Sequence, residues 1–184
     1  MEMKVKKSSI ISVILGYVAY FAAIFVIALL LVKFVGQRTI VHGTSMVPTL
    51  EDGDNLIADK VTYRFRDPER FEVIVFPYEY EESTYYIKRI IGLPGETVYI
   101  DESGNIWIDG EILEEHYGAD PIDYQGLAAE EIHLGEDEYF CLGDNRTVSK
   151  DSRYSDVGNI KREEIIGRTV FRIWPFSKIG PVGR

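Results

Sequence analysis

The sequence predicts a mainly β protein in which a single N-terminal transmembrane helix precedes one β-rich domain of antiparallel sheets. Residues 8–32 contain no charged side chain, and such a run is long enough for a helix to cross the ~30 Å hydrocarbon core of a bilayer. After this run, short β-branched and aromatic segments alternate with Gly, Pro, Asp and Asn, a pattern typical of strands and turns. A length of 184 residues fits one ordinary domain with one appended segment.

The apolar run predicts a transmembrane helix over residues 8–35. A cleaved signal peptide has a shorter apolar region of about 7–15 residues, so a permanent span is favoured. Lys4, Lys6 and Lys7 precede the run, and positive residues near a span tend to stay in the cytoplasm. Residues 1–7 are therefore expected in the cytoplasm and residues 36–184 outside the cell, in a protein that crosses the cell membrane once.

The β-rich domain is expected to contain a series of short strands. The hairpin signal is clearest where two alternating runs, 98–101 and 105–108, flank Glu102-Ser103-Gly104. Helical periodicity is weak and confined to 60–66 and 161–166. The predicted strands are 38–42, 54–59, 72–77, 84–91, 97–101, 105–109, 138–142 and 167–173.

Charge and cysteine content exclude several classes of function. The formal net charge is −10, which repels phosphate backbones, so no nucleic-acid partner is expected. Cys141 is the only cysteine, which excludes an intrachain disulfide and a site with several thiolate ligands. Residues 101–138 hold 13 acidic residues and no Lys or Arg. This acidic insertion is interpreted as a solvated surface loop in preference to a binding surface.

A candidate nucleophile lies shortly after the predicted span. The segment Gly43-Thr44-Ser45-Met46-Val47-Pro48-Thr49 follows a predicted strand, and a tight turn there would expose the Ser45 hydroxyl. Serines in Gly/Pro turns are usually structural. A catalytic role for Ser45 therefore requires a base nearby.

Lys88 is the best candidate for that base. His42, His116 and His133 are the usual type of base, but none is well placed relative to Ser45 along the sequence. In the predicted strand 84–91, alternation places Lys88 and Arg89 on opposite faces, so one of the two cations must lie among apolar neighbours. Burial lowers a lysine pKa from about 10.4 and would let Lys88 act as a neutral base. A surface lysine with an apolar stem explains this strand equally well.

The segment 143–153 is dense in polar side chains that could support such a site. If residues 149–153 are extended, then Ser149, Asp151 and Arg153 share one face. A hydroxyl would then lie beside a carboxylate–guanidinium pair. A loop closed by side-chain turns is the simpler explanation of this segment taken alone.

Together these segments resemble type I signal peptidases, which are Ser/Lys-dyad enzymes that release exported proteins from the membrane. The resemblance covers most of the chain and is more similar to the compact Gram-positive members than to larger two-span forms. It rests on four segments in the family's order: GTSMVPTL at 43–50, GDNLIADKVTYRFRDPERFEVIVF at 53–76, IKRIIGLPGE at 87–96 and GDNRTVSKDSR at 143–153.

The resemblance implies a role for each matching residue. Ser45 would be the nucleophile and Lys88 the general base. Ser149 would hydrogen-bond the lysine amine, while Asp151 and Arg153 would support this arrangement. No metal ion and no cofactor is required.

The resemblance also implies a substrate and its partners. Val41, Met46 and Ile87 are the expected substrate-binding residues and would favour small side chains at the −1 and −3 positions before the cut. The substrate, the signal peptide of a secretory preprotein, would bind as an added strand. The lipid bilayer and the secretion translocon are the further expected partners of this extracytoplasmic catalytic domain.

The sequence departs from the family pattern at three places. Gly43 stands where larger enzymes have a serine whose hydroxyl helps to form the oxyanion hole, so the Ser45 N–H and another donor must serve instead. Phe71-Glu72 replaces the more usual Gly-Asp, and Glu96 replaces a frequent Asp. Neither of these last two changes touches the dyad.

Two other functions remain open on the sequence. The first is a related Ser/Lys protease with a dedicated substrate, such as a pilin-processing or self-cleaving repressor-like member; the apolar run argues against the repressor-like type. The second is a membrane-anchored β-rich binding module in which Ser45 and Lys88 no longer react.

Overall fold

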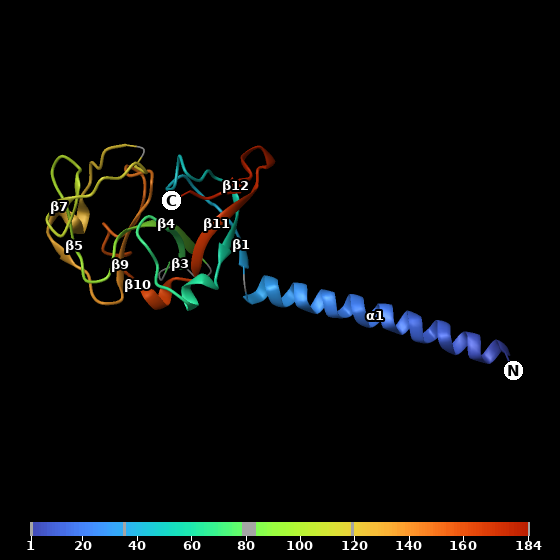
Figure 1. Ribbon diagram of the computed structural model, residues 1–184. Helices are drawn as coiled ribbons and strands as arrows, with labels where there is room; N and C mark the ends of the chain where they lie inside the picture. The colour runs from blue at the N-terminus through green and yellow to red at the C-terminus, as the bar shows by residue number, and fades with distance from the viewer. Residues whose placement is uncertain (1, 35, 79–83, 119, 184) are drawn as a thin grey trace.

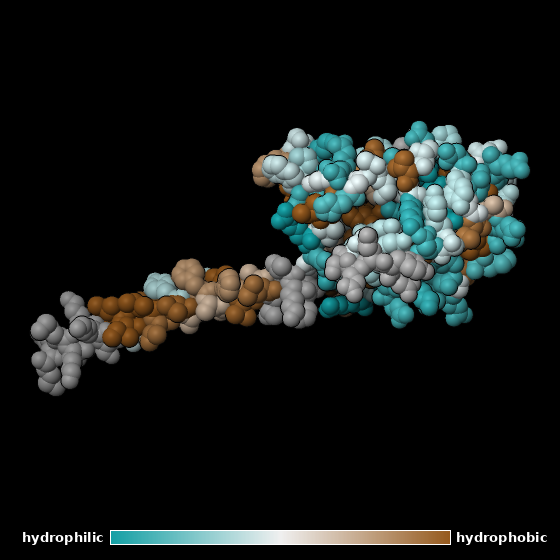
Figure 2. All heavy atoms as spheres, turned by 180° about the vertical axis from the view of Figure 1, so that it is seen from behind, coloured by the Kyte–Doolittle hydropathy of each residue, from teal (hydrophilic) through white to brown (hydrophobic). Residues whose placement is uncertain are grey.

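The N-terminal helix stands apart from a β domain (Figure 1). The computed structural model describes residues 2–34, 36–78, 84–118 and 120–183. Helix α1 spans Glu2–Phe34, and residue 35, the predicted end of the span, lies outside the described residues. Within the described chain, one helical stretch, Ile10–Leu29, is apolar and long enough to cross a membrane. Its side chains are exposed and form an apolar rod beside the polar surface of the domain (Figure 2).

The helix begins earlier than the predicted span. It already includes the charged residues Glu2, Lys4, Lys6 and Lys7, because Glu and Lys are favourable helix formers. The apolar run therefore gives the length of a possible membrane crossing, whereas the helix itself continues into the charged flank.

The main body is one antiparallel sheet with strand order β1-β2-β11-β3-β4-β9-β10, with β12 paired to β11. Strand β4 lies between β3 and β9, and Lys88 is opposite Ile74 while Arg89 is opposite Leu142. The strands of this sheet are β1 (Gly36–Ile40), β2 (Asn55–Asp59), β3 (Val73–Pro77), β4 (Tyr85–Gly92), β9 (Glu138–Leu142), β10 (Ile160–Lys161), β11 (Gly167–Trp174) and β12 (Gly180–Pro181). The predicted mainly β, antiparallel fold is confirmed.

A second, smaller antiparallel sheet has the order β7-β6-β5-β8 and lies at the end of the domain far from α1 (Figure 1). The predicted hairpin is present, with Val98 opposite Ile108 and Ile100 opposite Ile106. The strands are β5 (Thr97–Ile100), β6 (Ile106–Ile108), β7 (Glu111–Ile112) and β8 (Ile132–His133), and the 3-10 helix η2 (Gly126–Ala129) precedes β8.

Every predicted strand appears, with shifts at the ends. The predicted strand 38–42 becomes Gly36–Ile40, because the chain turns away toward the Ser45 segment after β1. The weak helical periodicity at 60–66 and 161–166 corresponds to the 3-10 turns η1 (Thr62–Arg64) and η3 (Arg162–Glu164). Another turn, η4 (Phe176–Lys178), precedes β12. Strands β7, β8, β10 and β12 were not predicted, since two residues each are too few to produce a periodic pattern.

The acidic insertion 101–138 differs from the expected solvated loop. It supplies most of the small sheet, and its residues Ile106, Ile122 and Leu134 are buried in one core with Ile91 and Phe140 of the main sheet. Widely spaced apolar residues point inward while most of the carboxylates stay exposed. The insertion is therefore a folded, acidic part of the domain.

A separate apolar core lies under the Ser45 segment. Met46 and Leu50 from that segment are fully buried, at 1% and 0% exposure. Burial of such side chains stabilises a fold by about 1.5–3 kcal/mol each. The core consists of Val41, Met46, Leu50, Leu56, Ala58, Val73, Val75 and Ile87. It fixes the Ser45 segment against strands β2, β3 and β4.

Candidate active site

Ser45 lies in a turn that follows β1 and is held at both ends. Val41 N donates to Asp54 O (2.8 Å), and Leu50 N donates to Met46 O (2.8 Å). Gly43 adopts a φ of 84°, a left-handed conformation that favours glycine, and its N–H donates to Asp52 Oδ1 (2.8 Å). The turn leaves Ser45 half-buried, with its hydroxyl facing β4.

Lys88 reaches Ser45 from β4. Its side chain is buried, and Nζ hydrogen-bonds to Ser45 Oγ at 2.9 Å and to Ile87 O at 3.2 Å. The ammonium position also lies 4.9 Å from the centre of the Tyr86 ring. The structure thus brings together the two residues that the sequence analysis selected as nucleophile and base.

The surroundings of Lys88 make loss of its proton easier than in an exposed lysine. Burial lowers the pKa of Lys88 to about 8, and Arg153 acts in the same direction, whereas Asp151, Cys141 and Asp144 oppose the shift. A low-dielectric environment disfavours the charged ammonium. A neutral amine next to a serine hydroxyl can accept its proton during attack on a carbonyl carbon.

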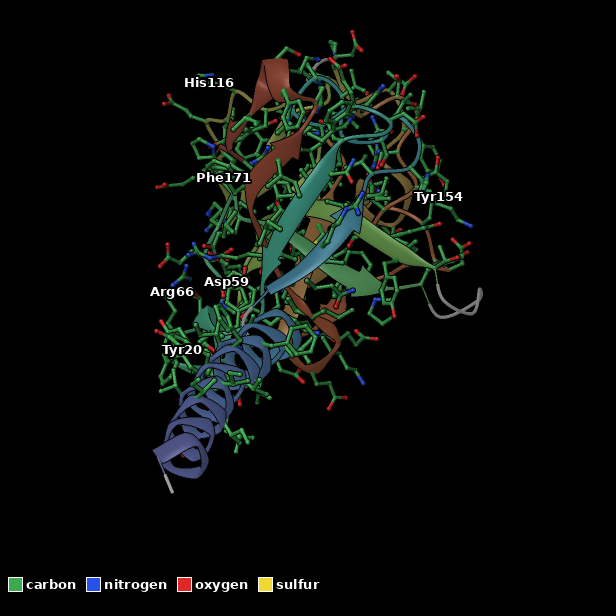
Figure 3. All side chains as sticks on the ribbon, turned by 90° about the vertical axis from the view of Figure 1, so that its right-hand side faces the viewer. Tyr20, Asp59, Arg66, His116, Tyr154 and Phe171 are labelled. Atoms are coloured by element: carbon green, nitrogen blue, oxygen red, sulfur yellow. The ribbon has the colours of Figure 1, made fainter. Side chains whose placement is uncertain are left out.

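The histidines are not placed to serve as the base. All three are exposed, and His133 Nδ1 pairs with Thr97 Oγ1 on the small sheet. His116 lies at the periphery of the domain in Figure 3. His42 borders the same groove as Ser45, but the side chain within hydrogen-bond distance of Ser45 Oγ is that of Lys88.

The Ser149 side chain differs from the expectation. Its Oγ is buried without a hydrogen-bond partner, so the expected bond to Lys88 is absent. The hydroxyl instead packs against Gly143, where an added Cβ would lie 2.5 Å from Ser45 O and closer still to Ser149 Oγ. Only glycine fits at 143, because no Cβ tolerates such contacts. Ser149 thus lies next to the Ser45 turn without contacting the amine in this arrangement.

Asp151 and Arg153 form the expected ion pair. Arg153 Nε donates to Asp151 Oδ1 (2.8 Å) and Nη2 donates to Oδ2 (2.9 Å), with both side chains buried. Asp151 Oδ2 also accepts the Gly143 N–H at 3.1 Å. This doubly hydrogen-bonded pair fixes the chain between Gly143 and Arg153 beneath the lysine.

Sequence reasoning missed a second buried ion pair. Arg89 donates from Nε to Asp144 Oδ1 (2.8 Å) and from Nη2 to Oδ2 (2.7 Å), and both side chains are fully buried. Thr49 Oγ1 donates to the same carboxylate at 2.5 Å. Both cations of β4 are therefore buried, whereas alternation required burial of only one. A second cation in an apolar strand was the signal that a buried carboxylate had to be near.

A groove of about 750 Å³ runs past Ser45 and Lys88. It is bordered by residues 37–46 and 84–88 and by Val148 and Lys150. The three expected substrate-binding residues, Val41, Met46 and Ile87, all line it and are buried. Their buried apolar side chains line the same groove as Ser45.

The edge strand β1 and the first half of β4 border the groove. Strand β1 pairs on one side, with β2, and lies at the edge of the sheet. Strand β9 pairs with β4 from Arg89 onward, and the preceding part of β4 pairs with β3 from Tyr85, opposite Pro77. An extended peptide can add to an edge strand through its backbone. Among the described residues, no group of three or more His, Cys, Asp or Glu side chains could hold a metal ion.

Comparison with known families identifies the chain. The family model for signal peptidase, peptidase S26, matches residues 14–174. The chain belongs to this family. As a signal peptidase it is a serine endopeptidase that removes signal peptides, and the predicted family resemblance is confirmed.

Individual signal peptidases are similar to this chain over most of their length. Signal peptidase I of Leptolyngbya laminosa is 41% identical over 165 residues, covering 86% of this chain and 78% of the relative. Probable signal peptidase I-2 of Synechocystis sp. is 40% identical over 152 residues, covering 80% of this chain and 67% of the relative. Signal peptidase I of Bacillus caldolyticus is 35% identical over 171 residues, covering 86% of this chain and 90% of the relative. A signal peptidase I crystal structure from Enterococcus faecalis has 33% identity and a TM-score of 0.46, with 56% of this chain and 97% of that chain covered.

Proposed function

We propose that Ser45 and Lys88 form the catalytic dyad of this signal peptidase. The observation that carries the proposal is the 2.9 Å contact between Ser45 Oγ and a buried Lys88 Nζ. Neutral Lys88 takes the Ser45 proton as Oγ bonds to the scissile carbonyl carbon, and then gives that proton to the leaving amine as the C–N bond breaks. Water then attacks the acyl-enzyme carbonyl carbon and passes a proton to Lys88, which returns it to Ser45 Oγ as the ester bond breaks and the signal peptide is released.

The oxyanion that forms in both steps needs hydrogen-bond donors. The Gly43 N–H donates to Asp52 Oδ1 and is held away from this task. The Ser45 N–H is the proposed donor, in agreement with the absence of a side-chain hydroxyl at position 43. Asp151 and Arg153 hold the loop that carries Ser149.

The substrate is proposed to bind as an extended strand in the groove between β1 and β4. The position of β1 at the edge of the sheet and its place along the groove support this binding mode. Val41, Met46 and Ile87 would contact the residues before the cut, and the buried apolar surface that they form favours small side chains at −1 and −3. A groove of this kind separates a fitting from an ill-fitting substrate by a few kcal/mol of transition-state binding at most for each group that does not fit.

The apolar helix is proposed to span the cell membrane once, with residues 1–7 in the cytoplasm and the catalytic domain outside. The lysines before the apolar run support this orientation. Ser45 follows the helix closely, so a substrate anchored in the same bilayer is held near the groove at high effective concentration. The bilayer and the secretion translocon are proposed partners on this basis.

Cleavage of a panel of unrelated preproteins by the detergent-solubilised full-length protein tests the proposed specificity. Substrates with Ala at −1 and −3 are expected to be cut at one site. Substitution of either Ala by Leu should lower kcat/KM by about tenfold or more, since a misfit side chain costs about 1–3 kcal/mol. Fragment masses establish the cut site. Equal cleavage of the Leu substrates would contradict the assignment of the groove, and cleavage of a single preprotein would indicate a dedicated peptidase.

A further inference from the structure

Strand β4 and the loop 143–153, together called the active-site framework, contain three buried arginines. They supply only two buried carboxylates of their own. Arg89, Arg146 and Arg153 are 0%, 3% and 1% exposed. Asp144 pairs with Arg89, and Asp151 pairs with Arg153. A buried guanidinium without a carboxylate is strongly destabilising, so Arg146 requires a partner from elsewhere in the chain.

That partner is Glu115, in the acidic insertion. Its Oε1 lies 2.8 Å from Arg146 Nη2, and both side chains are largely buried. Gly118 also lies against this guanidinium, where an added Cβ would approach Arg146 Cζ to 3.2 Å. The insertion therefore completes the charge balance of the framework.

The same part of the insertion contacts the other two arginines. The Tyr117 ring lies over Arg89, with Cζ 3.7 Å from the ring centre. Arg153 Nη1 donates to Tyr124 O (3.0 Å), and Leu127 N donates to Arg153 O (2.8 Å). Residues 115–118 and 120–127 are called the crossing segment below.

The crossing segment passes over one end of the domain. Figure 3 shows His116, near the start of this segment, on the opposite side of the domain from Tyr154. The Tyr124 ring packs against the Tyr154 ring at 5.0 Å, so the other end of the segment reaches that opposite side. The segment thus extends across the loop that carries Asp144, Asp151 and Arg153.

An ion pair, a hydrogen bond and a packing contact connect Glu115 to the nucleophile. Arg146 Nε, on the guanidinium that Glu115 holds, donates to Gly143 O (3.0 Å). Gly143 packs directly against Ser45 O, and Asn145 N donates to Ser45 O (3.0 Å). A shift of Arg146 would therefore move the backbone on which Ser45 rests.

We propose that Glu115 and Tyr117 are positioning residues for catalysis, and that the crossing segment holds Ser45 and Lys88 in register through Arg146 and Arg89. This inference rests on the proposed function of Ser45 and Lys88. None of the crossing-segment residues lines the groove, so they act on the reacting groups without touching the substrate. Misplacement of reacting groups by about 1 Å can lower a rate by about 10²-fold.

Steady-state cleavage of a model preprotein by the full-length protein tests the inference. Glu115→Gln is expected to lower kcat by about 10–100-fold and to leave KM nearly unchanged. Glu111→Gln is the matched control, because Glu111 is an exposed carboxylate on β7 of the same small sheet, and it should behave as the parent. An unchanged kcat for Glu115→Gln, or a raised KM with unchanged kcat, overturns the inference.

The route through Arg146 is tested in a second background. In Arg146→Met, the further change Glu115→Gln should have little additional effect on kcat, since its contact has already been removed. An equal loss in both backgrounds refutes this route and points to a general loss of folding.

Tyr117 provides an independent test that does not leave a buried charge unpaired. Tyr117→Phe keeps an aromatic face over Arg89 and should keep the parent kcat, whereas Tyr117→Leu should lower kcat about tenfold. Equal kcat values in the two variants overturn the inference even if Glu115→Gln fails to fold. Retained cleavage in Ser45→Ala would instead refute the proposed dyad, a result independent of the crossing segment.

Discussion

Lys88→Ala is expected to abolish preprotein cleavage, with a loss of at least about 10³-fold in kcat/KM. The variant lacks the amine that takes the Ser45 proton, and general-base catalysis alone contributes about 10²–10⁴-fold. Ser45→Ala should show the same loss because it removes the attacking atom. The measurement is the initial rate of cleavage of a preprotein by each full-length variant in detergent.

The controls for this prediction separate a missing base from a damaged fold. Lys161→Ala removes a lysine whose residue is exposed, away from the groove, and should cleave as the parent does. The double variant Ser45→Ala/Lys88→Ala should be no less active than either single variant, because residues that act as one unit are not additive. Substantial cleavage by Lys88→Ala, or by Ser45→Ala, would refute the dyad.

Asp144→Asn is expected to lower the free energy of unfolding by about 3–5 kcal/mol. Arg89 and Asp144 are fully buried and joined by two hydrogen bonds, and removal of one charge leaves the other uncompensated in a low-dielectric interior. Urea unfolding followed by tryptophan fluorescence measures the change, with Trp107 in the small sheet and Trp174 in the main sheet.

Two comparisons test the physical cause of this loss. Asp156→Asn disrupts the ion pair with Lys150, whose side chains are 37% and 44% exposed, and should change the unfolding midpoint little because exposed pairs contribute little. The variant Arg89→Met/Asp144→Leu removes both charges and should recover part of the lost stability. If Asp144→Asn unfolds at the parent midpoint, the pair is not the structural requirement described here.

Much of the fold and the centre of the site could be predicted from the sequence. Alternation in β4 indicated that Lys88 and Arg89 face different environments, and the motif around Ser45 indicated a nucleophile. Neither pattern could tell that both cations are buried, because this depends on Asp144 arriving from a distant loop. Local patterns report which face a side chain occupies and do not report its partner across the fold.

The acidic insertion shows the same limit more strongly. Its composition indicated a solvated loop, since 13 acidic residues and no Lys or Arg lie in residues 101–138. Most of those carboxylates are indeed exposed, but Glu115 pairs with the buried guanidinium of Arg146. The Ser149 hydroxyl is another example, because residues 149–153 form a loop that turns and not the extended strand that alternation assumed, and this hydroxyl has no hydrogen-bond partner among the described residues.

The dependence of the cleavage rate on pH tests the central claim most directly, namely that Lys88 acts as a neutral base. Burial lowers the Lys88 pKa to about 8, and the amine is reactive only when deprotonated. In the parent, kcat/KM should therefore rise as the pH passes through about 8 and level off above it. A kcat/KM that keeps rising up to the ordinary lysine pKa of about 10.4 would contradict the account. So would a kcat/KM that does not rise with pH anywhere between about pH 6 and about 10.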